Sequence, residues 1–440
     1  MGSLQEKISA AILARIRQKR PSTVVEKRPT VSSFPTAKLR EVTFADFAAV
    51  ARLKKRCGIV EDSPENWTRL WRSNPALGEE EARRPIGWVL DAGGEIVGYL
   101  GNISLRCRYG DKTLSAVATH GFCADPPYRA VTLSLASAFY RQKSVDFFVS
   151  SSAIEVSGKM ALAFKCAVVP QPDYDTVLFW VLRPYSFART LARKLDIKPL
   201  LSPISSVVIA LWVAADKIIH RRWPSSDVAA LKVMVGGLDE IGHEMAELWR
   251  DKLKEESRMY ADRSTEVLRW HFEIPGDRGS VRVLRCYRGG DLWGYAVVRN
   301  DEDPRDGIRR SIIADLIVRK DDTTVVEALF VAAYEQAKIA GSEILEVQGF
   351  PSHIRQLTVG WRPYLRKYPA CPYYFRATDA ELHKALSDAS AWYACPYDGD
   401  ATLIRPSYSS SAARPVAAAM ERRHSAETVE LAEIRRTEVF

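Results

Sequence analysis

Two stretches of the sequence, residues 70–100 and 268–296, repeat one order of residues, and this repeat restricts the fold more than any other feature. Each stretch contains a Leu and a Trp, then a Pro, and ends in Gly-Gly, an acid, an aliphatic residue, one further residue and Gly-Tyr. Paired glycines in front of a strand pattern are typical of a hairpin turn. Because order and approximate spacing are both kept, the sequence predicts two tandem copies of one α/β unit, with Gly98-Tyr99 and Gly294-Tyr295 at equivalent places.

The first copy continues, in residues Thr113–Gln142, with the pattern of a strand, a tight turn and a helix. Small or polar residues alternate in the strand, and Asp125-Pro126-Pro127 then ends it because proline has no N–H group to donate. Apolar residues recur at helical spacing from Val131 onward. A strand that enters a helix through a tight turn directs backbone N–H groups at one point, which favours phosphate or pyrophosphate, and Arg129 adds a positive charge there. A turn that serves only packing is the alternative.

In this pattern the chain resembles the GNAT superfamily of acyl-CoA-dependent N-acyltransferases. Pro126, Tyr128 and Arg129 match the family's Pro-x-Tyr-Arg sequence, while Thr132 and Ser134 stand where the family usually has glycines. The resemblance implies an α/β fold of two tandem GNAT-like domains, each a mixed twisted sheet flanked by helices, with acyl-CoA as co-substrate. It also implies that coenzyme A is bound by Phe122, Cys123, Tyr128, Arg129, Ala130, Val131, Thr132, Leu133 and Ser134.

The repeat and the resemblance together divide the chain. They predict a basic N-terminal arm (1–36), a first domain with the acyl-CoA site (37–182), a linker with an apolar helix (183–229), a second domain (230–404) and a disordered or loosely helical tail (405–440). When the copies are aligned, His120 falls on Ala314, and the Tyr128-Arg129 turn falls on Asp322-Thr323. Since Asp321 and Asp322 place two carboxylates at the phosphate end, the second copy is predicted to keep the fold and lose the donor site.

Three residues of the first copy are candidates for catalysis. In the family the amine attacks the thioester directly, backbone N–H groups polarise the carbonyl, and a tyrosine reprotonates the thiolate. Neither copy has a tyrosine at the family's position. Tyr174, just beyond the helix of the first copy, is the candidate substitute. His120 on the central strand and Glu155 at a helix start are candidate bases, although a core histidine and a favourable helix-end charge explain them equally. Cys123 lies three residues beyond His120 and would share its face only through a bulge, so we interpret it as a small buried thiol.

The expected function is transfer of an acyl group from acyl-CoA to an amine of a sugar, an amino acid or a peptide. A catalytically silent binding or scaffold protein of the same fold is the alternative, which the absent glycines and tyrosine favour. The net charge of +9 on 440 residues suits anionic ligands or a membrane surface, and no nucleic-acid-binding motif is present, so no nucleic acid partner is expected. No metal is expected either, because Asp398-Gly399-Asp400 is interpreted as a turn.

The location of the protein is inferred from its cysteines and from one apolar segment. Seven cysteines without a Cys-x-x-Cys pair indicate reduced thiols, and no secretory signal is visible, so a cytoplasmic protein is expected. Leu200–Ala215 contains no charged residue and is flanked by basic ones. It is shorter than the ~20 residues that span a bilayer, so it is either an interfacial membrane helix or a buried interdomain helix.

Overall fold

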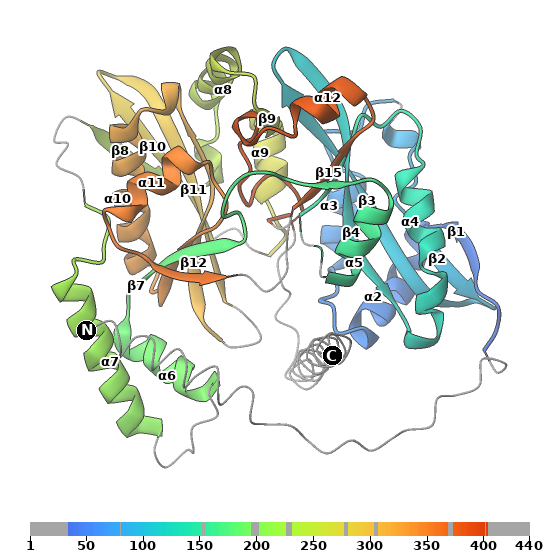
Figure 1. Cartoon of the computed structure of the whole chain (residues 1–440), viewed down its shortest axis with the longest axis horizontal. Helices are drawn as coiled ribbons and strands as arrows, with labels where there is room; N and C mark the ends of the chain where they lie inside the picture. Colours follow the sequence, from blue (N-terminus) through green and yellow to red (C-terminus); the bar gives the residue numbers. More distant parts are fainter. Residues whose placement is uncertain are drawn as a thin grey trace, which may run out of the picture. The chain divides into compact units, whose positions relative to one another are not determined.

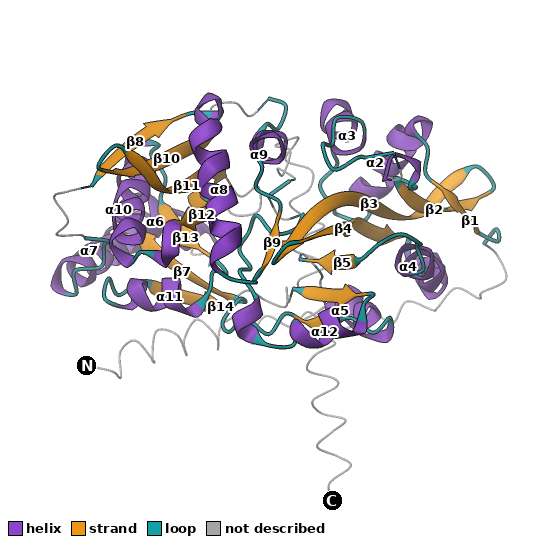
Figure 2. Ribbon diagram, turned by 90° about the horizontal axis from the view of Figure 1, so that it is seen from above, coloured by secondary structure: helices purple, strands orange, loops and turns teal. Residues whose placement is uncertain are grey.

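The computed structural model describes residues 34–79, 81–151, 153, 155–194, 202–225, 231–276, 280–302, 307–367, 373–400 and 402–403. The predicted tail and nearly all of the predicted N-terminal arm lie outside these residues, and so do Leu200 and Leu201 of the apolar segment. The described chain is built around two mixed β-sheets, which lie side by side in Figures 1 and 2.

The first sheet has the order β1-β2-β3-β4-β5-β15-β6, and β9 extends it by pairing with the end of β3. All neighbours pair antiparallel except β4 and β5, which are parallel. The strands are β1 (Lys38–Glu41), β2 (Gly87–Ala92), β3 (Glu95–Tyr109), β4 (Lys112–Ala124), β5 (Phe147–Ser150), β6 (Ala167–Val168), β9 (Met259–Ala261) and β15 (Tyr374–Ala377).

The second sheet has the order β14-β7-β13-β12-β11-β10-β8, again with one parallel pair, β12 and β13. Its strands are β7 (Thr176–Val181), β8 (Lys232–Gly236), β10 (Val281–Arg288), β11 (Asp291–Glu302), β12 (Arg309–Val318), β13 (Ile344–Val347) and β14 (Tyr364–Lys367). The prediction of an α/β fold with two mixed sheets is therefore confirmed.

Helices cover the sheets in the same chain order in both halves. In the first half α2 and α3 pack on one face, while α4 and α5 pack on the other, because alternate strand residues point to opposite faces. The α-helices are α2 (Phe47–Arg56), α3 (Pro64–Trp71), α4 (Leu133–Tyr140), α5 (Glu155–Ala163), α6 (Pro184–Lys194), α7 (Ser202–Ile219), α8 (His243–Glu255), α9 (Thr265–Phe272), α10 (Thr323–Ile339), α11 (Ser352–Val359) and α12 (Ala380–Ala385). Short 3-10 helices are η2 (Phe44–Asp46), η3 (Glu81–Arg83), η4 (Pro126–Val131), η5 (Leu238–Glu240), η6 (Arg319–Asp321) and η7 (Ala389–Ala391).

The register of the central strands confirms the duplication. Gly98 and Tyr99 pair with Ala124 and Cys123 in the first sheet, and Gly294 and Tyr295 pair with Val318 and Ile317 in the second. Each hairpin in front of these strands turns on two glycines of positive φ, 69° and 96° in the first copy and 61° and 97° in the second. The two Gly-Tyr pairs therefore occupy equivalent places, as the repeat predicts.

The halves share strands: the first half contributes β7 to the second sheet, and the second half contributes β9 and β15 to the first. β7 precedes the predicted boundary at residue 182 but pairs with β13 and β14 in the second sheet, where it is an inner strand. β15 comes from the second half and pairs between β5 and β6 in the first sheet. Figure 1 shows β15, drawn in dark red, beside the strands of the first half. Each sheet is therefore completed by the other half of the chain.

The uncharged segment forms most of α7. Ser206, Ala210 and Val213 are its buried residues, and Val213 packs with Val181 and Ile344 of the second sheet. Within the described residues, no helix has the length and apolar content needed to cross a bilayer.

Candidate functional site

The candidate site lies where the two parallel strands of the first sheet separate. The pairing of β4 with β5 runs from Ala116–Phe147 to Ala118–Val149 and stops there, although β4 continues to Ala124. The second sheet separates at the same place, since β12 and β13 pair only from Arg310–Ile344 to Ile312–Glu346. Strands that diverge in this way leave the backbone of a central strand available to another group.

A β-bulge on the central strand marks the opening. Between the pairs Tyr99–Cys123 and Gly101–His120, β4 has two residues where β3 has one. Gly121 is in the left-handed region at φ 62°, which a residue with a side chain adopts only with strain. The second sheet is also irregular here, with Ala314 as the extra residue of β12.

The second half fills its own opening. The backbone N–H of Tyr397 donates to the carbonyl oxygen of Ala314 at 3.1 Å, and the hydroxyl of Tyr393 donates to that of Leu316. The equivalent carbonyls of the first half belong to His120 and Phe122. Among the described residues, these two accept no hydrogen bond from outside the strands of their sheet. The two openings therefore share a geometry, but only the second is filled by described residues of the chain, those of Tyr393–Tyr397.

The turns that follow the central strands differ in the same way, because, among the described residues, only the turn of the second half is capped by an acidic side chain of the chain itself. In the second half the carboxylate of Asp322 accepts from the N–H groups of Thr324 and Val325 at 3.0 and 3.2 Å, so it caps α10. Burial raises the pKa of Asp322, but hydrogen bonds from Arg288 and Thr324 outweigh burial and lower the pKa to about 2. The neighbouring Asp321 pairs with Lys252 at 2.5 Å. The two carboxylates lie where the sequence places them, and each already has a partner within the chain.

The turn of the first half carries no such cap. Asp125 precedes η4, but its carboxylate pairs with Arg56 at 2.7 Å and makes no capping bond. The hydroxyls of Thr132 and Ser134 each donate backward, at 2.7 Å, to the carbonyls of Arg129 and Val131. Arg129, Val131 and Leu133 are exposed. The start of α4 therefore presents a positive helix end and a cation, and no side chain of the described residues caps it.

Behind the bulge, three ionisable side chains are buried together. Lys54 Nζ lies 2.6 Å from Asp62 Oδ2 and 2.9 Å from His120 Nε2, and His120 Nε2 lies 3.0 Å from the same oxygen. Burial raises the pKa of Asp62, but the charges and hydrogen bonds of His120 and Lys54 outweigh burial and hold that pKa well below its usual range. The carboxylate of Asp62 therefore pairs with Lys54 of α2 and with His120 of β4 at the same time.

Two polar atoms beside this cluster have no hydrogen-bond partner among the described residues, the hydroxyl of Tyr99 and Nδ1 of His120. In the second half the equivalent hydroxyl, that of Tyr295, donates to Asp315 at 2.9 Å, and Asp315 aligns with Gly121 of the first half. The first half therefore has the same tyrosine, but a glycine stands where the second half has the acid. Buried polar groups without partners are uncommon in proteins, so the pair indicates a place where a ligand or water completes the bonding.

The second half balances its buried charge internally. Arg263 is fully buried, lies 3.0 Å from both Asp315 and Asp398, and is surrounded by the rings of Trp249, Tyr260, Tyr393 and Tyr397. Asp398 therefore belongs to this ion network, and Asp400 bonds to Ser151 at 2.8 Å. No cluster of three His, Cys, Asp or Glu side chains suited to a metal ion occurs in the described part of the chain.

The structure brings only some of the predicted residues together. The bulge places Cys123 on the same face of the sheet as His120, but the thiol of Cys123 bonds to Cys57 instead. The hydrogen bond with Cys57, together with burial, raises the pKa of Cys123 well above its usual value. Cys123 is therefore a small buried thiol. Phe122 and Tyr128 are half-buried on the α4 side of the sheet. Tyr174 is buried against Tyr373, with ring centres 5.5 Å apart. Glu155 begins α5, and its side chain lies outside the described residues.

Sequence reasoning missed Lys54, Asp62 and Tyr99 as members of the cluster. One signal was present, because Lys54 follows Val50 by four residues and so lies on the apolar face of α2. A lysine on a buried helix face needs an acidic partner. Asp62 gave no such signal, since it lies in the loop before α3 and reaches Lys54 only through the tertiary fold.

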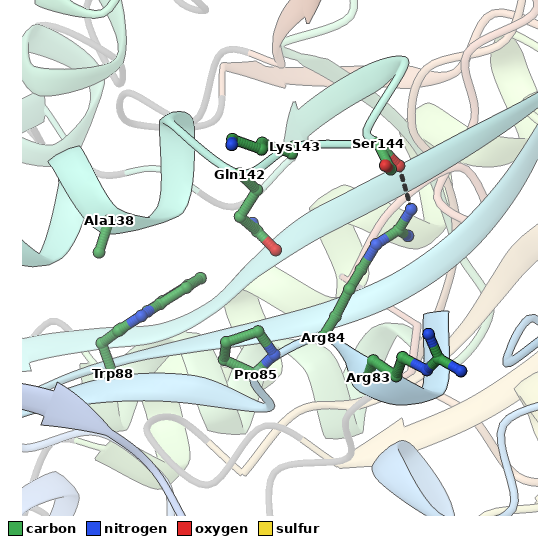
Figure 3. Close-up of a pocket in the computed structure, with 8 residues that line it drawn as sticks. All are labelled: Arg83, Arg84, Pro85, Trp88, Ala138, Gln142, Lys143 and Ser144. Carbon is green, nitrogen blue, oxygen red and sulfur yellow. Dashed lines mark hydrogen bonds between the residues drawn. The ribbon is translucent and has the colours of Figure 1, made fainter. Parts of the chain in front are cut away.

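A cavity of about 440 Å³ lies at the other end of α4 from the turn. Figure 3 shows its lining residues, which are Arg83, Arg84, Pro85, Trp88, Ala138, Gln142, Lys143 and Ser144. Arg84 donates to the carbonyl of Ser144 and, at 2.8 Å, to the hydroxyl of Ser115. Gln142 is bonded to Asn102. These polar groups join the cavity walls to one another, and none of the residues of the cluster lines the cavity.

Comparison with family models finds no match, and comparison with curated proteins finds none either. Solved structures with a similar course of the chain include a GCN5-related N-acetyltransferase from Anabaena variabilis ATCC 29413, with a TM-score of 0.48, 10% identity, and coverage of 78% of this chain and 73% of that one. One from Kribbella flavida has a TM-score of 0.47, 11% identity, and coverage of 78% and 72%. Saccharomyces cerevisiae N-myristoyltransferase with bound myristoyl-CoA has a TM-score of 0.48, 12% identity, and coverage of 82% and 83%.

Proposed function

We propose that the first half of the chain binds an acyl-CoA at the turn after β4 and transfers its acyl group to an amine of a sugar, an amino acid or a peptide. The observation that carries the proposal is the difference between the halves. Both have the same opening beside the central strand, but the second half occupies its opening with Tyr393–Tyr397 and caps its helix with Asp322. Within the residues that the structure describes, the first half does neither, so its opening and its helix start can take a ligand.

The donor fits this site by its chemistry. Its pyrophosphate suits the start of α4, where the helix dipole and Arg129 are both positive. Its pantetheine arm carries two amides that can pair with exposed backbone, and the separation of β4 from β5 supplies such backbone. The thioester would then lie near the bulge at Gly121, beside the buried cluster.

The transfer forms a C–N bond and breaks the C–S bond of the thioester, so one proton leaves the amine and one joins the thiolate. We assign the first role to His120, because its Nδ1 is unpartnered among the described residues while Asp62 holds the opposite ring nitrogen. Tyr99 keeps its proton, since burial raises the pKa of its hydroxyl well above the usual value, and it can donate a hydrogen bond to the reacting groups. Tyr174 and Glu155 stay candidates for the remaining proton steps.

The binding site is tested by placing a glutamate at the aligned position of each copy. Arg129→Glu removes a charge-assisted contact and adds repulsion, so we expect coenzyme A to bind ~2–4 kcal/mol more weakly, a factor of roughly thirty to a thousand. Thr323→Glu makes the matching change at the aligned place in the second copy and should alter binding little. Isothermal titration of both variants decides between the copies. Weaker binding by Thr323→Glu alone would move the site to the second half.

Activity is tested separately, with a panel of acyl-CoA donors and mass-spectrometric detection of released thiol. His120→Gln should lower turnover while leaving coenzyme A affinity within a small factor, because the side chain lies away from the turn. Equal losses of turnover and affinity would contradict its assignment as a base.

One observation favours a second function, a binding protein without turnover. His120, Asp62 and Lys54 are almost completely buried, and each is already paired within the cluster. Affinity for coenzyme A without thiol release by any donor would support this second function.

A further inference from the structure

Helix α7 exposes a continuous row of large apolar side chains. Its buried residues Ser206, Ala210 and Val213 recur at helical spacing and face the second sheet. The opposite side is also apolar, and Leu211 there is 66% exposed. The exposed set comprises Ile204, Val207, Val208, Leu211, Trp212, Ile218 and Ile219. A helix that is apolar on both sides is usually covered on both, so this face indicates a partner.

The charge around this face is strongly positive. Residues 183–225, which contain α6 and α7, hold eight Lys or Arg and two Asp, while the whole chain carries a net +9. Arg189 and Arg193 on α6 and Arg221 after α7 are exposed. The described acid, Asp216, is held inward by Arg222 at 2.6 Å and by the hydroxyl of Tyr364 at 2.5 Å. The apolar row is therefore bordered by cations and by no outward-facing carboxylate within the described residues of this segment.

Each of the two helices also exposes an aromatic residue with a polar tip. Trp212 on α7 is 42% exposed and Tyr185 on α6 is 53% exposed. Trp and Tyr concentrate where hydrocarbon meets water, because one end of each ring system is apolar and the other can donate a hydrogen bond. In Figure 1, α6 and α7 lie together at one end of the second sheet, so both can meet one flat surface.

We propose that α7 lies in the plane of an anionic lipid surface, with Ile204, Leu211 and Trp212 inserted and the arginines of α6 near the headgroups. Apolar burial and attraction to anionic lipid act together in helices of this kind. The described helices do not include one that could span the bilayer, which agrees with a helix that lies on it. This proposal is independent of the proposed acyl transfer.

Charge argues against the two other occupants. A second copy of the chain would bring two strongly positive segments face to face, which costs free energy. The N-terminal residues 1–33 contain seven Lys or Arg and two Glu, so they too have the same sign as the α6–α7 surface. An anionic surface is complementary to both.

The test is flotation of the full-length protein with vesicles of phosphatidylcholine, with and without phosphatidylglycerol. We expect binding to the anionic vesicles only, weakening as salt is raised. Leu211→Glu should lower the partition coefficient about tenfold or more, since it replaces an inserted Leu by a charge. Leu162→Glu, on an exposed position of α5 in the other half, is the matched control and should bind as the unaltered protein does.

A second variant tests the electrostatic part. Arg189→Glu and Arg193→Glu should each weaken binding about fivefold at low salt, with less effect at high salt. Both residues are exposed, so folding should be kept, which a thermal melt checks.

Three results would overturn the proposal. The first is no flotation on anionic vesicles, and the second is equal flotation of Leu211→Glu. The third is a concentration-dependent dimer that Leu211→Glu abolishes, because the face would then join two copies of the chain. Loss of flotation in Ile12→Glu, with Leu211→Glu unaffected, would assign lipid contact to the N-terminal residues instead.

Discussion

At the scale of single residues, the two halves treat buried charge differently. The second half surrounds Arg263 with two carboxylates and four aromatic rings, and the carboxylates of Asp315 and Asp398 both pair with its guanidinium. The first half holds Lys54 and His120 with one carboxylate, and the hydroxyl of Tyr99 has no partner among the described residues. Removing one member of a buried ion pair commonly costs several kcal/mol, so Asp62 is needed to keep both Lys54 and His120 in place.

His271 gives a prediction for pH dependence. Burial, and then the charges of Arg69, Arg299 and Arg263, hold the pKa of this histidine well below its usual value, and its Nε2 lies 2.6 Å from Thr402 Oγ1. The unfolded chain takes up a proton near pH 6.5 while the folded chain does not. The contribution of His271 to the free energy of unfolding should therefore be greatest above pH ~6.5. It should fall below that pH by up to about 1.4 kcal/mol per pH unit.

The measurement is urea unfolding between about pH 5 and pH 7. His271→Gln removes the titrating group and should flatten the slope, whereas Thr402→Val keeps the histidine and should retain the slope. Parallel profiles for His271→Gln and the unaltered protein would show that His271 does not cause the pH dependence of stability.

At the scale of elements, the bulge in β4 decides which side chains reach the opening. A Cβ on Gly121 would lie 2.6 Å from Lys54 Cε and 2.8 Å from its Nζ, at a φ of 62°. Gly93, in the hairpin turn, has a similar φ of 69° and nothing within 4 Å of a Cβ. An alanine at Gly93 therefore measures backbone strain alone, whereas an alanine at Gly121 measures backbone strain together with the contact with Lys54.

Gly93→Ala should cost about 1–2 kcal/mol, the strain of a left-handed residue. Gly121→Ala should cost about 1–3 kcal/mol more, because Lys54 must leave its place beside Asp62. Chemical unfolding of the two variants measures the difference. Equal costs would mean that Lys54 moves freely, and the cluster would then not be a rigid part of the site.

The sequence predicted the copies and their alignment well, because hairpin glycines and strand alternation are local signals. The register confirms that Tyr99 and Tyr295 are equivalent and that His120 aligns with Ala314. The bulge at Gly121 was not predictable, since a glycine in a strand has several explanations. The exchange of β7 and β15 left no local trace either, because an apolar strand pattern does not specify which sheet accepts the strand.

At the scale of the whole molecule, the exchanged strands join the halves more firmly than the connecting segment does. β7 lies between β13 and β14, so removing it would leave β14 without a partner and open one edge of β13. β15 is in the same position between β5 and β6. Neither half can complete its sheet from its own residues.

A cut between the halves should therefore not separate them. A protease site inserted at residues 226–230 and then cleaved should give two fragments that elute together in size-exclusion chromatography. They should part only in denaturant, with one unfolding transition for both sheets. Separation under native conditions would contradict the exchange.

The exchange also sets the order of events while the chain is being made. β5 leaves the ribosome more than 200 residues before β15, its neighbour in the sheet. At roughly 5–20 residues per second, the first half would wait about 10–40 s with an unpaired inner strand edge. β7 is likewise made long before β13 and β14. A nascent chain with two open edges is a substrate for chaperones, so the yield of folded protein in the cell should depend on them more than the size of either half suggests.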